Sequence, residues 1–392
     1  MSVLCVAIIA DYLEEQWPSM DLVADMLLAH LRKEHAETIA PVLVRPAMRR
    51  RLSRLPLPSI ARSVDRIVAR QWDYPREIGA LDSGFDLYHI VDHTYAHLVH
   101  ALPPGRTVVT CHDVDAFRSV LEPAQERRSR PFRWMSERIL SGLRAAAHVP
   151  CDSEATRDAL VSLAGFPPDR LSVIPNGSSS EGWGEPDAHA DFEAAQLLGP
   201  RRGVELLHVG STIPRKRIDV LLEVFAAVRA VRSDARLVRV GGPFTAAQRV
   251  RARELGVLDD ITVLPFVDRA TLSAVYRRAV LALLPSEREG FGLPLVEALG
   301  CGTPVVASDI PVLREVGGGA VEYCPVADVA AWRDTVLRLA AERDHSRHAW
   351  SARRVAALDR AADFSWSRYA DQVVAVYEAV TGRPSPSPEP ST

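Results

Sequence analysis

Short apolar runs alternate with longer amphipathic segments along the first half of this chain. The run 3–10 predicts a buried strand, and the spacing of apolar residues in 18–32 predicts a helix. Strands that alternate with helices form a parallel sheet covered on both faces, because each crossover is right-handed. The first half therefore predicts a Rossmann-like domain. Further strands are predicted at 38–44, 86–91, 108–112, 148–152 and 171–174, and helices at 133–147 and 154–163.

The same alternation restarts near residue 204. Residues 179–203 are polar and rich in glycine and proline, which is typical of a linker between domains. We therefore predict a first domain over 1–178 and a second Rossmann-like domain over 204–363. Ligands of such domains bind beyond the carboxyl ends of the strands, so a substrate is expected in a cleft between the two. Strands of the second domain are predicted at 204–209, 235–240, 261–264, 280–284, 304–307 and 321–323.

The end of the chain divides into a helix and a tail. Apolar residues in 364–380 fall on one helical face. Residues 381–392 are dominated by proline and serine, cannot form a core, and are predicted to be disordered.

Composition excludes several classes of protein. With 392 residues the chain can form two cores, and its formal net charge of −3 disfavours a nucleic-acid partner. Its five cysteines form no Cys-x-x-Cys pair and are expected to be reduced thiols. The sequence shows no signal peptide and no apolar run of the roughly 20 residues that a bilayer span needs, so we expect a cytoplasmic protein.

The segment PSEREGFGLPLVEALGCGTP at 285–304 has the pattern of a strand end, a glycine-containing loop and a short helix. Pro285 ends an apolar run, and Pro294 occupies a first helical position. Glu289 is predicted at the crest of the loop, with Glu297 eight positions later in the first helical turn. A helix amino end with unshielded N–H groups favours an anion, and two carboxylates suit hydroxyl groups. Phosphate with a polyol describes a nucleotide sugar.

With three further motifs, this segment resembles the Glu-x7-Glu signature of retaining glycosyltransferases of family 4, the glycosyl transferases group 1. The further motifs are VIPNG at 173–177, VGSTIPRKRIDVLLEVF at 209–225 and FVDRATLSAVYRRA at 266–279. The resemblance implies the α/β GT-B fold, in which two Rossmann-like, doubly wound parallel-sheet domains face each other across a cleft. It also implies that the helix 364–380 returns to the first domain.

The resemblance implies a donor site in the second half of the chain. Arg215 and Lys216 would bind the diphosphate, where a preplaced cation stabilises the charge of the departing nucleoside diphosphate. Glu289 would contact the transferred sugar, and Glu297 the ribose hydroxyls. The other implied donor-binding residues are Gly210, Ser211, Phe266 and Val267 (the last two near the nucleobase) and the N–H groups of Phe291, Gly292 and Leu293.

A histidine near the sugar ring completes the catalytic residues that the resemblance implies, and His112 is its candidate. Asp113 and Asp115 beside it form an Asp-x-Asp pair, which holds a metal ion in glycosyltransferases of the other fold. Arg215 and Lys216 already supply the charge that a metal would bring. We therefore expect no metal and no cofactor apart from the nucleotide sugar.

Acceptor binding is expected in the first domain. Candidate contacts are Trp17, Asp92, Tyr95 and Asn176, with ordinary surface polarity as the alternative for the cluster that begins at Asp92. Family 4 members often have a glycine-rich loop after the first strand, but 10–21 of this chain contains no glycine. Acceptor chemistry is therefore expected to differ from that of the glycine-loop members.

Arginines with interleaved apolar residues fill the stretch 45–70. A basic amphipathic surface can contact an anionic membrane, which would suit a lipid-linked acceptor. A solvated edge of the domain is the alternative interpretation, because charge-rich runs usually have that role.

The sequence thus predicts transfer of a sugar from a nucleoside diphosphate sugar to a hydroxyl acceptor with retention at the anomeric carbon. The acceptor would be a glycan, a lipid-linked sugar or a small molecule. Two alternatives keep the same fold: a nucleotide-sugar epimerase, and a non-catalytic protein that binds a sugar nucleotide.

Overall fold

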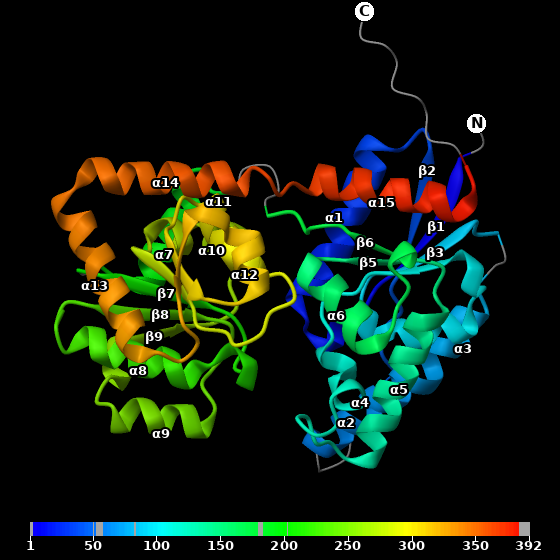
Figure 1. Cartoon of the computed structure of the whole chain (residues 1–392), viewed down its shortest axis with the longest axis horizontal. Helices are drawn as coiled ribbons and strands as arrows, with labels where there is room; N and C mark the ends of the chain where they lie inside the picture. The colour runs from blue at the N-terminus through cyan, green and yellow to red at the C-terminus, as the bar shows by residue number, and fades with distance from the viewer. Residues whose placement is uncertain are drawn as a thin grey trace, which may run out of the picture. The chain divides into compact units, whose positions relative to one another are not determined.

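The computed structural model of the chain describes residues 3–49, 51, 58–81, 84–178, 183–201 and 203–383. These residues belong to two compact units (Figure 1). The first unit comprises Met1–Gly177 and Trp366–Thr392, and the second comprises Ser178–Ser365. The first unit is therefore assembled from both ends of the chain.

Parallel strands form the centre of the first unit. They are β1 (Leu4–Ile9), β2 (Ile39–Val44), β3 (Leu87–Ile90), β4 (Thr107–Val109), β5 (Val149–Cys151) and β6 (Leu171–Val173). Four of them pair in the order β2-β1-β3-β4, and β5 pairs with β6. Isolated bridges join the β4 side to the β5 side. The helices are α1 (Pro18–Glu34), α2 (Pro58–Val68), α3 (Tyr74–Gly79), α4 (Arg118–Leu121), α5 (Arg130–Ala145), α6 (Glu154–Ala164) and α15 (Trp366–Thr381).

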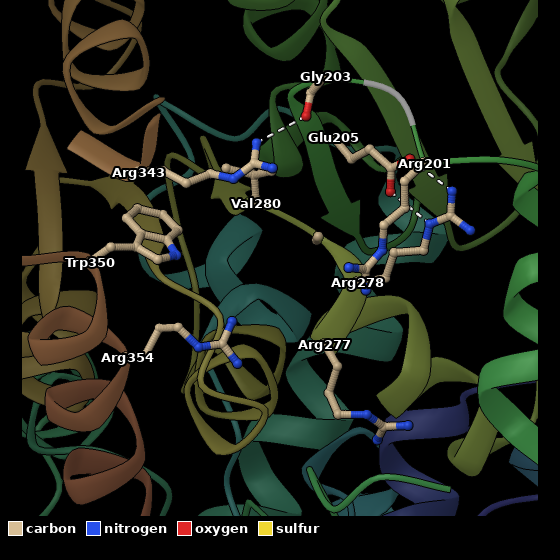
Figure 2. Close-up of a pocket in the computed structure, with 10 residues that line it drawn as sticks. Arg201, Gly203, Glu205, Arg277, Arg278, Val280, Arg343, Trp350 and Arg354 are labelled. Carbon is tan, nitrogen blue, oxygen red and sulfur yellow. Dashed lines mark hydrogen bonds and ion pairs between the residues drawn. The ribbon is translucent and has the colours of Figure 1, made fainter. Parts of the chain in front are cut away.

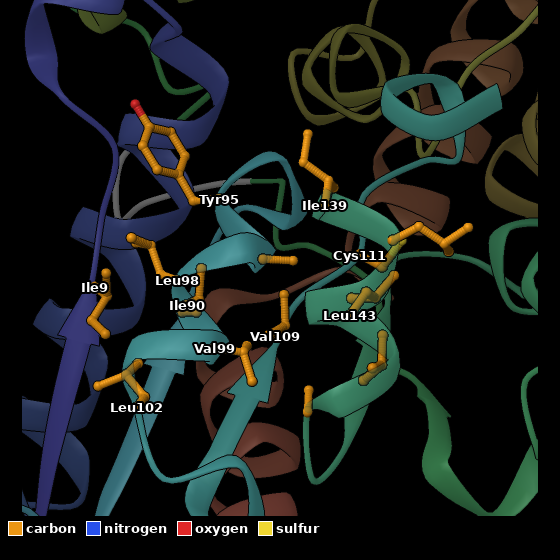
Figure 3. Close-up of a cluster of buried hydrophobic side chains, with 14 of the residues drawn as sticks. Ile9, Ile90, Tyr95, Leu98, Val99, Leu102, Val109, Cys111, Ile139 and Leu143 are labelled. Carbon is orange, nitrogen blue, oxygen red and sulfur yellow. The ribbon is translucent and has the colours of Figure 1, made fainter. Parts of the chain in front are cut away.

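Apolar side chains cover both faces of this sheet. On one face, α5 and the 3-10 segment η3 (His93–Ala101) pack over β3 and β4, as Figure 3 shows for Val99, Val109 and Leu143. On the other face, α1 and α15 pack together over β1. The two layers of helices explain why the strands are apolar along their whole length.

α15 is anchored in the first unit by large buried side chains. Trp366 and Tyr377 are at most 1% exposed. The Tyr377 hydroxyl lies 2.7 Å from Nδ1 of His89 on β3, and Nε2 of His89 lies 2.8 Å from the Thr110 hydroxyl. A Cβ atom at Gly177 would lie 2.5 Å from Cγ of Trp366, so this position has room for glycine alone. The end of the chain is thus part of the first core.

The second unit is a six-stranded parallel sheet with the order β12-β11-β10-β7-β8-β9. Its strands are β7 (Glu205–Val209), β8 (Arg236–Val240), β9 (Ile261–Leu264), β10 (Leu281–Leu284), β11 (Val305–Ser308) and β12 (Val321–Cys324). Its helices are α7 (Ala188–Leu198), α8 (Ile218–Arg229), α9 (Ala246–Glu254), α10 (Arg269–Arg278), α11 (Leu293–Gly300), α12 (Pro311–Gly317), α13 (Val329–His345) and α14 (Arg347–Ala361). α8 and α13 pack together on one face, and α10 and α11 cover the other (Figure 1).

The predicted strands and the helices predicted with them are confirmed, most of them within one or two residues of their predicted ends. The strand predicted at 108–112 ends at Val109, because Cys111 beyond it forms an isolated bridge to Cys151. The structure differs over the segment 179–203, where the sequence predicts a linker. Its residues 188–198 form α7, which packs on α10 in the second unit. The predicted tail lies outside the described residues from 384 onward.

Candidate functional site

The strand order of the second unit reverses between β7 and β10. In open α/β sheets, ligands bind beyond the carboxyl ends of the strands at such a switch point. The loops that follow these two strands are residues 210–217 and 285–292. They contain the residues that the sequence predicts for the diphosphate and the sugar.

Glu289 lies beside two cations at this switch point. Lys216 Nζ donates a hydrogen bond to Glu289 Oε1 at 2.6 Å, and Arg215 Nη1 lies 3.6 Å from Oε2. The Ser286 hydroxyl also donates to Oε1, at 2.7 Å. The side chain of Glu289 is 5% exposed and that of Lys216 is 12% exposed. The structure therefore brings the predicted Glu289, Arg215 and Lys216 together in one largely buried group.

A tight turn presents the two cations. Pro214–Lys216 form the 3-10 segment η7, and Arg217 after it has a left-handed backbone with φ of 47°. A residue with a Cβ atom loses about 1 to 2 kcal/mol in that conformation. The N–H of Glu287 donates to the carbonyl of Arg215 at 2.9 Å, which ties the two loops together. The strained turn is thus held by the loop that carries Glu289.

The carboxylate of Glu289 stays ionised in this environment. Burial by itself would raise the pKa of Glu289, but Lys216, Arg215 and the hydroxyl of Ser286 outweigh burial and lower the pKa below its ordinary value. The group is therefore an anion at neutral pH. An incoming anionic ligand can therefore take over one of the two cations that now contact Glu289.

The start of α11 offers further donors. Gly292 is the N-cap with φ of 94°, and a Cβ atom there would lie 2.8 Å from Cδ2 of Leu313. Glycine is therefore required for this bend. The N–H groups of Phe291, Gly292 and Leu293 have no acceptor among the residues that the structure describes. Free donors at a helix start are suited to a phosphate or a hydroxyl oxygen.

Glu297 is buried within the second turn of α11, one turn later than the sequence predicts. The Tyr276 hydroxyl donates to its Oε2 at 3.1 Å, and Nη1 of Arg269 lies 3.6 Å from Oε1. Burial raises the pKa of Glu297 to about 7, against the opposing effects of Arg269 and Tyr276. Trp183 donates its indole N–H to the backbone carbonyl of Glu297 at 3.1 Å. Glu297 is thus held by contacts with Tyr276, Arg269 and Trp183, and the spacing of the two glutamates in the sequence does not reveal these contacts.

The raised pKa of Glu297 predicts a pH-dependent cost in stability. Between its unfolded pKa of about 4.5 and about 7, the folded state binds more protons than the unfolded state, so stability falls as pH rises. The full cost is on the order of 3 kcal/mol, because each pKa unit corresponds to about 1.4 kcal/mol. Glu297→Gln is expected to have a higher free energy of unfolding than the wild type at pH 8, with a much smaller difference at pH 5, measured by urea denaturation without ligand.

Glu254→Gln is the matched control for this comparison, because Glu254 on α9 has 59% of its side chain exposed. This variant should change the free energy of unfolding little, as most substitutions of exposed residues do. An equal difference for Glu297→Gln at pH 5 and pH 8 would contradict the raised pKa.

The remaining predicted donor residues lie at the same edge of the sheet. Gly210 and Ser211 follow β7 directly. Phe266 follows β9 with 66% of its surface exposed, so it is not a core residue, and Val267 next to it is half-buried. An exposed aromatic ring at this edge is free to stack on a base.

Sequence reasoning missed Arg239 and His208, which are both buried near the loop that begins at Gly210. Arg239 on β8 is fully buried and donates to the carbonyl of Gly210 at 2.9 Å. Gly241 has φ of 122°, and its Cβ would lie 2.1 Å from that same carbonyl. Burial lowers the pKa of His208 to about 3, with Arg239 and Lys216 adding to the effect, so His208 is neutral. An arginine in the middle of an apolar strand, before two glycines, is the signal that could have revealed this support.

His112 in the first unit is held by the protein itself. Its Nδ1 lies 2.6 Å from Oδ2 of Asp152, and its Nε2 lies 2.7 Å from the carbonyl of Val91. Both partners are acceptors, so both ring nitrogens donate and the imidazole is protonated. Burial would lower the pKa of His112, but Asp152 and the other partners raise it to about 9. Both ring nitrogens are thus engaged within the protein, and the predicted place of His112 near the sugar ring stays a prediction.

The strand order of the first unit reverses between β1 and β3, and a carboxyl pair follows these strands. Burial, followed by the nearby Asp92, raises the pKa of Asp11 well above its usual range. Burial would also raise the pKa of Asp92, but His93 and the hydrogen bonds to the carboxylate lower it instead. Thr94 supplies two of those bonds, from its N–H at 2.8 Å and its hydroxyl at 2.6 Å. Asp92 is thus where the sequence predicts a polar group, and Asp11 is a second carboxyl group, with a raised pKa, that the sequence reasoning missed.

The other predicted acceptor contacts differ in exposure. Trp17 is 43% exposed and accessible to a ligand. Tyr95 is 1% exposed and packs edge-on against Tyr74 in the core, so ordinary surface polarity does not describe it, and its acceptor role stays a prediction. Asn176 is also buried, and its side-chain amide donates to Oδ2 of Asp152 at 2.7 Å, which makes it a support of the His112 pair.

Asp113 and Asp115 are engaged locally. Asp113 accepts the N–H of Asp115 at 2.9 Å and lies 3.5 Å from Nε2 of His93. Among the described residues, no group of three or more His, Cys, Asp or Glu side chains is arranged to hold a metal ion. Both aspartates thus have contacts within their own loop, and the expectation that no metal ion binds there stays a prediction.

Ion pairs engage several arginines of the stretch 45–70. Arg45 pairs with Asp25 at 3.0 Å, and Arg49 pairs with Glu77 at 3.1 Å. Arg51 pairs with Asp73, and Arg70 pairs with Glu15 at 3.3 Å. Less basic charge is therefore available than the sequence suggests. Residues 50 and 52–57 of this stretch lie outside the described residues. Membrane contact stays a prediction, and none of the helices described is long and apolar enough to cross a bilayer.

Two protein families match the chain in succession. Residues 20–181 match the family described as Glycosyltransferase Family 4, and residues 191–354 match Glycosyl transferases group 1. The D-inositol 3-phosphate glycosyltransferase 1 of Catenulispora acidiphila is 29% identical over 295 residues, which cover 71% of this chain and 68% of that protein. The D-inositol 3-phosphate glycosyltransferase of Mycolicibacterium gilvum is 32% identical over 280 residues, which cover 69% of this chain and 60% of that protein. The chain thus spans about two thirds or less of the length of these relatives.

Solved structures share the fold over nearly the whole chain. Sucrose-phosphate synthase from Thermosynechococcus elongatus superposes with a TM-score of 0.73 at 20% identity, covering 97% of this chain and 99% of that one. Anabaena HepE in complex with UDP and glucose superposes with a TM-score of 0.67 at 16% identity, covering 95% of this chain and 99% of that one. At this level of identity the likeness establishes the fold.

Proposed function

The chain belongs to the family 4, group 1 glycosyltransferases and has the GT-B fold, and from this premise we propose that it is a retaining, metal-independent hexosyltransferase. The donor would be a nucleoside diphosphate sugar, and the acceptor a hydroxyl group of a glycan, a lipid-linked sugar or a small molecule. The observation that carries the proposal is the buried group of Glu289, Lys216 and Arg215 at the switch point of the second unit.

Diphosphate binding would use the cations of this group. Lys216 is paired with Glu289 at 2.6 Å, so a diphosphate oxygen has to compete with a carboxylate for the same ammonium. The ammonium is compact and its carbon chain is flexible, which allows it to turn from one anion to the other. Arg215 offers a planar fork suited to two phosphate oxygens. Together the two side chains would supply the charge that a metal ion provides in other enzymes.

The transfer step would proceed on one face of the sugar. The bond from the anomeric carbon to the diphosphate oxygen breaks, and a bond to the acceptor oxygen forms on the same face. The acceptor proton passes to the departing diphosphate oxygen, so no enzyme nucleophile is required. Lys216 and Arg215 would stabilise the negative charge that develops on the leaving group. Glu289, released from Lys216, would accept hydrogen bonds from the sugar hydroxyls.

The rest of the donor would lie along the same edge. Glu297 would accept the ribose hydroxyls, which its ionised form does best, and Phe266 would stack on the base. The N–H groups of Phe291 and Gly292 would bind sugar or phosphate oxygens. The acceptor would bind in the first unit near Trp17 and the Asp11–Asp92 pair. His112 would act there as a buried positive charge that positions its neighbours.

The experiment that tests this proposal is a product assay in two stages. A thermal-shift screen of UDP, GDP, ADP and dTDP, with and without EDTA, first identifies the nucleotide that stabilises the protein. The matching nucleotide sugar is then supplied with D-inositol 3-phosphate and with a panel of other hydroxyl acceptors. We expect one nucleotide to raise Tm equally in both conditions and the product, analysed by NMR, to keep the anomeric configuration of the donor.

Two results would count against the proposal. Stabilisation that requires a divalent metal would refute the metal-independent donor site, and a product of inverted configuration would refute same-face attack. Glu287→Gln provides the matched control, because Glu287 lies two residues from Glu289 with 36% of its side chain exposed. This variant should behave like the wild type in both stages.

A further inference from the structure

A pocket opens at the opposite edge of the sheet of the second unit (Figure 2). Gly203 and Glu205 line it at the start of β7, and Val280 lines it just before β10. The cavity has a volume of about 130 Å³. All strands of this sheet are parallel, so the pocket lies at their amino ends, whereas the donor site lies at their carboxyl ends. A strand of five residues such as β7 separates the two edges by about 16 Å.

Positive charge dominates the lining of this pocket. Among the described residues, five arginines and one carboxylate line it, which gives these residues a formal charge of +4. The arginines come from separate elements: one precedes β7, two end α10, one lies near the end of α13 and one lies on α14. In chain order they are Arg201, Arg277, Arg278, Arg343 and Arg354.

Two of these arginines have carboxylate partners. Arg278 forms a bidentate pair with Glu205 at 2.8 and 2.9 Å, and Arg236 also contacts this carboxylate at 2.8 Å. Arg277 donates to Asp191 at 2.6 Å. Glu205 therefore already serves two guanidinium groups and cannot neutralise a third.

The other three arginines form no ion pair with a carboxylate of the described residues, although Arg232 and, more weakly, Arg343 lower the pKa of the Asp234 carboxyl. Arg343 donates to the backbone carbonyl of Gly203 at 2.9 Å. Arg201 and Arg354 have neither a hydrogen bond nor an ion pair with any residue that the structure describes. In Figure 2 the indole of Trp350 lies between Arg343 and Arg354 on the same wall. Guanidinium groups gathered around one cavity repel one another unless an anion lies among them.

We infer that this pocket binds a small anion with two or more phosphate groups. A guanidinium presents a planar fork of donors that matches two phosphate oxygens, and separate arginines on three walls match an anion with several charges. The cavity is large enough for pyrophosphate and too small to enclose a complete nucleotide sugar. The indole of Trp350 supplies a flat apolar wall beside the anion.

Helix electrostatics explain part of this arrangement but not the rest. Arg277 and Arg278 stand in the last turn of α10, where positive charge is favourable next to the helix carboxyl end. Arg354 stands in the middle of α14, and Arg201 lies outside any helix. Neither position gains from a helix dipole. A ligand accounts for these two side chains as well.

Calorimetric titration of the full-length chain with pyrophosphate tests the inference. The titration uses Lys216→Ala protein at low salt, so that the diphosphate site at the switch point does not contribute. We expect pyrophosphate to bind, with a Kd that rises tenfold or more in Arg354→Gln or Arg343→Gln. Higher salt should weaken the binding, because the interaction is between opposite charges.

Arg347→Gln is the matched control, since Arg347 is an exposed residue of the same helix that does not line the pocket. The inference is overturned when pyrophosphate does not bind, or when Arg347→Gln weakens binding as much as Arg354→Gln does. Orthophosphate and adenosine monophosphate are titrated in parallel. Tighter binding of pyrophosphate than of either monophosphate supports the inference, and any other order contradicts the assignment of two or more phosphate groups. Circular dichroism of each variant verifies its fold.

Discussion

Replacing Lys216 by alanine is expected to lower kcat by 100- to 1000-fold, which corresponds to about 3 to 4 kcal/mol of barrier. The ammonium is the closest cation to Glu289 and lies at the switch point where the diphosphate is proposed to leave. Its removal takes away a charge whose effect is largest when the leaving group becomes an anion. The measurement is the rate of product formation at saturating donor, with the Tm of the same sample as a test of folding.

The chain offers an unusually clear control for this experiment. Of its 47 basic residues other than histidine, two are lysines, Lys33 and Lys216. Lys33 is an exposed residue of α1, so Lys33→Ala should retain full activity. Lys216→Arg tests whether a lysine is required at this position in a chain so rich in arginine. We expect this variant to be impaired as well, because the larger planar guanidinium group cannot turn between Glu289 and a phosphate. More than a tenth of wild-type activity in Lys216→Ala would contradict the proposed donor site.

Replacing Trp366 by alanine is expected to cost about 3 to 5 kcal/mol of stability, the largest loss among the changes considered for the first unit. The indole is 1% exposed and lies edge-on to Tyr369 with 5.4 Å between ring centres. Gly177 leaves no side chain that could fill the resulting cavity. Because the chain has two units, the first unit should unfold more easily while the second changes little. The measurement is hydrogen exchange, with α15 as the reporter of the first unit and α13 as the reporter of the second.

Trp134→Ala is the matched control, because the indole of Trp134 on α5 is 46% exposed. Its loss should stay below about 1 kcal/mol, as for most surface positions. Equal losses for the two tryptophan variants would show that α15 contributes little to the first core.

Hydrophobic patterning was sufficient to predict the sheet of each unit. Each strand is a short apolar run because helices cover both faces, and that burial leaves a direct trace in the sequence. α7 was not predicted, since proline and glycine surround it and outweighed its helical interior in the composition. The Asp187 side chain accepts the N–H groups of His189 and Ala190, so an N-cap marks its start.

The candidate site was predictable where its residues are close in the sequence. Glu289 and Glu297 belong to one motif, and Arg215 and Lys216 follow directly from another. The environment of His112 was not predictable, because Asp152 and Asn176 lie 40 residues or more away and meet it only in the folded unit. Residue type indicates that a histidine can bind a sugar, but the partners that occupy its nitrogens depend on tertiary structure.

The first unit has a consequence for the order in which the chain matures during synthesis. Gly177 and every strand of that unit leave the ribosome before Ser178–Ser365, yet Trp366 and Tyr377 of α15 are made only after that whole segment. Until α15 is made, the early segment leaves uncovered the part of its sheet that α1 does not cover, whereas Ser178–Ser365 is continuous and can complete its core without α15. The part that is translated first is thus the part that is completed last, and a nascent chain stalled before α15 is the species most in need of a chaperone.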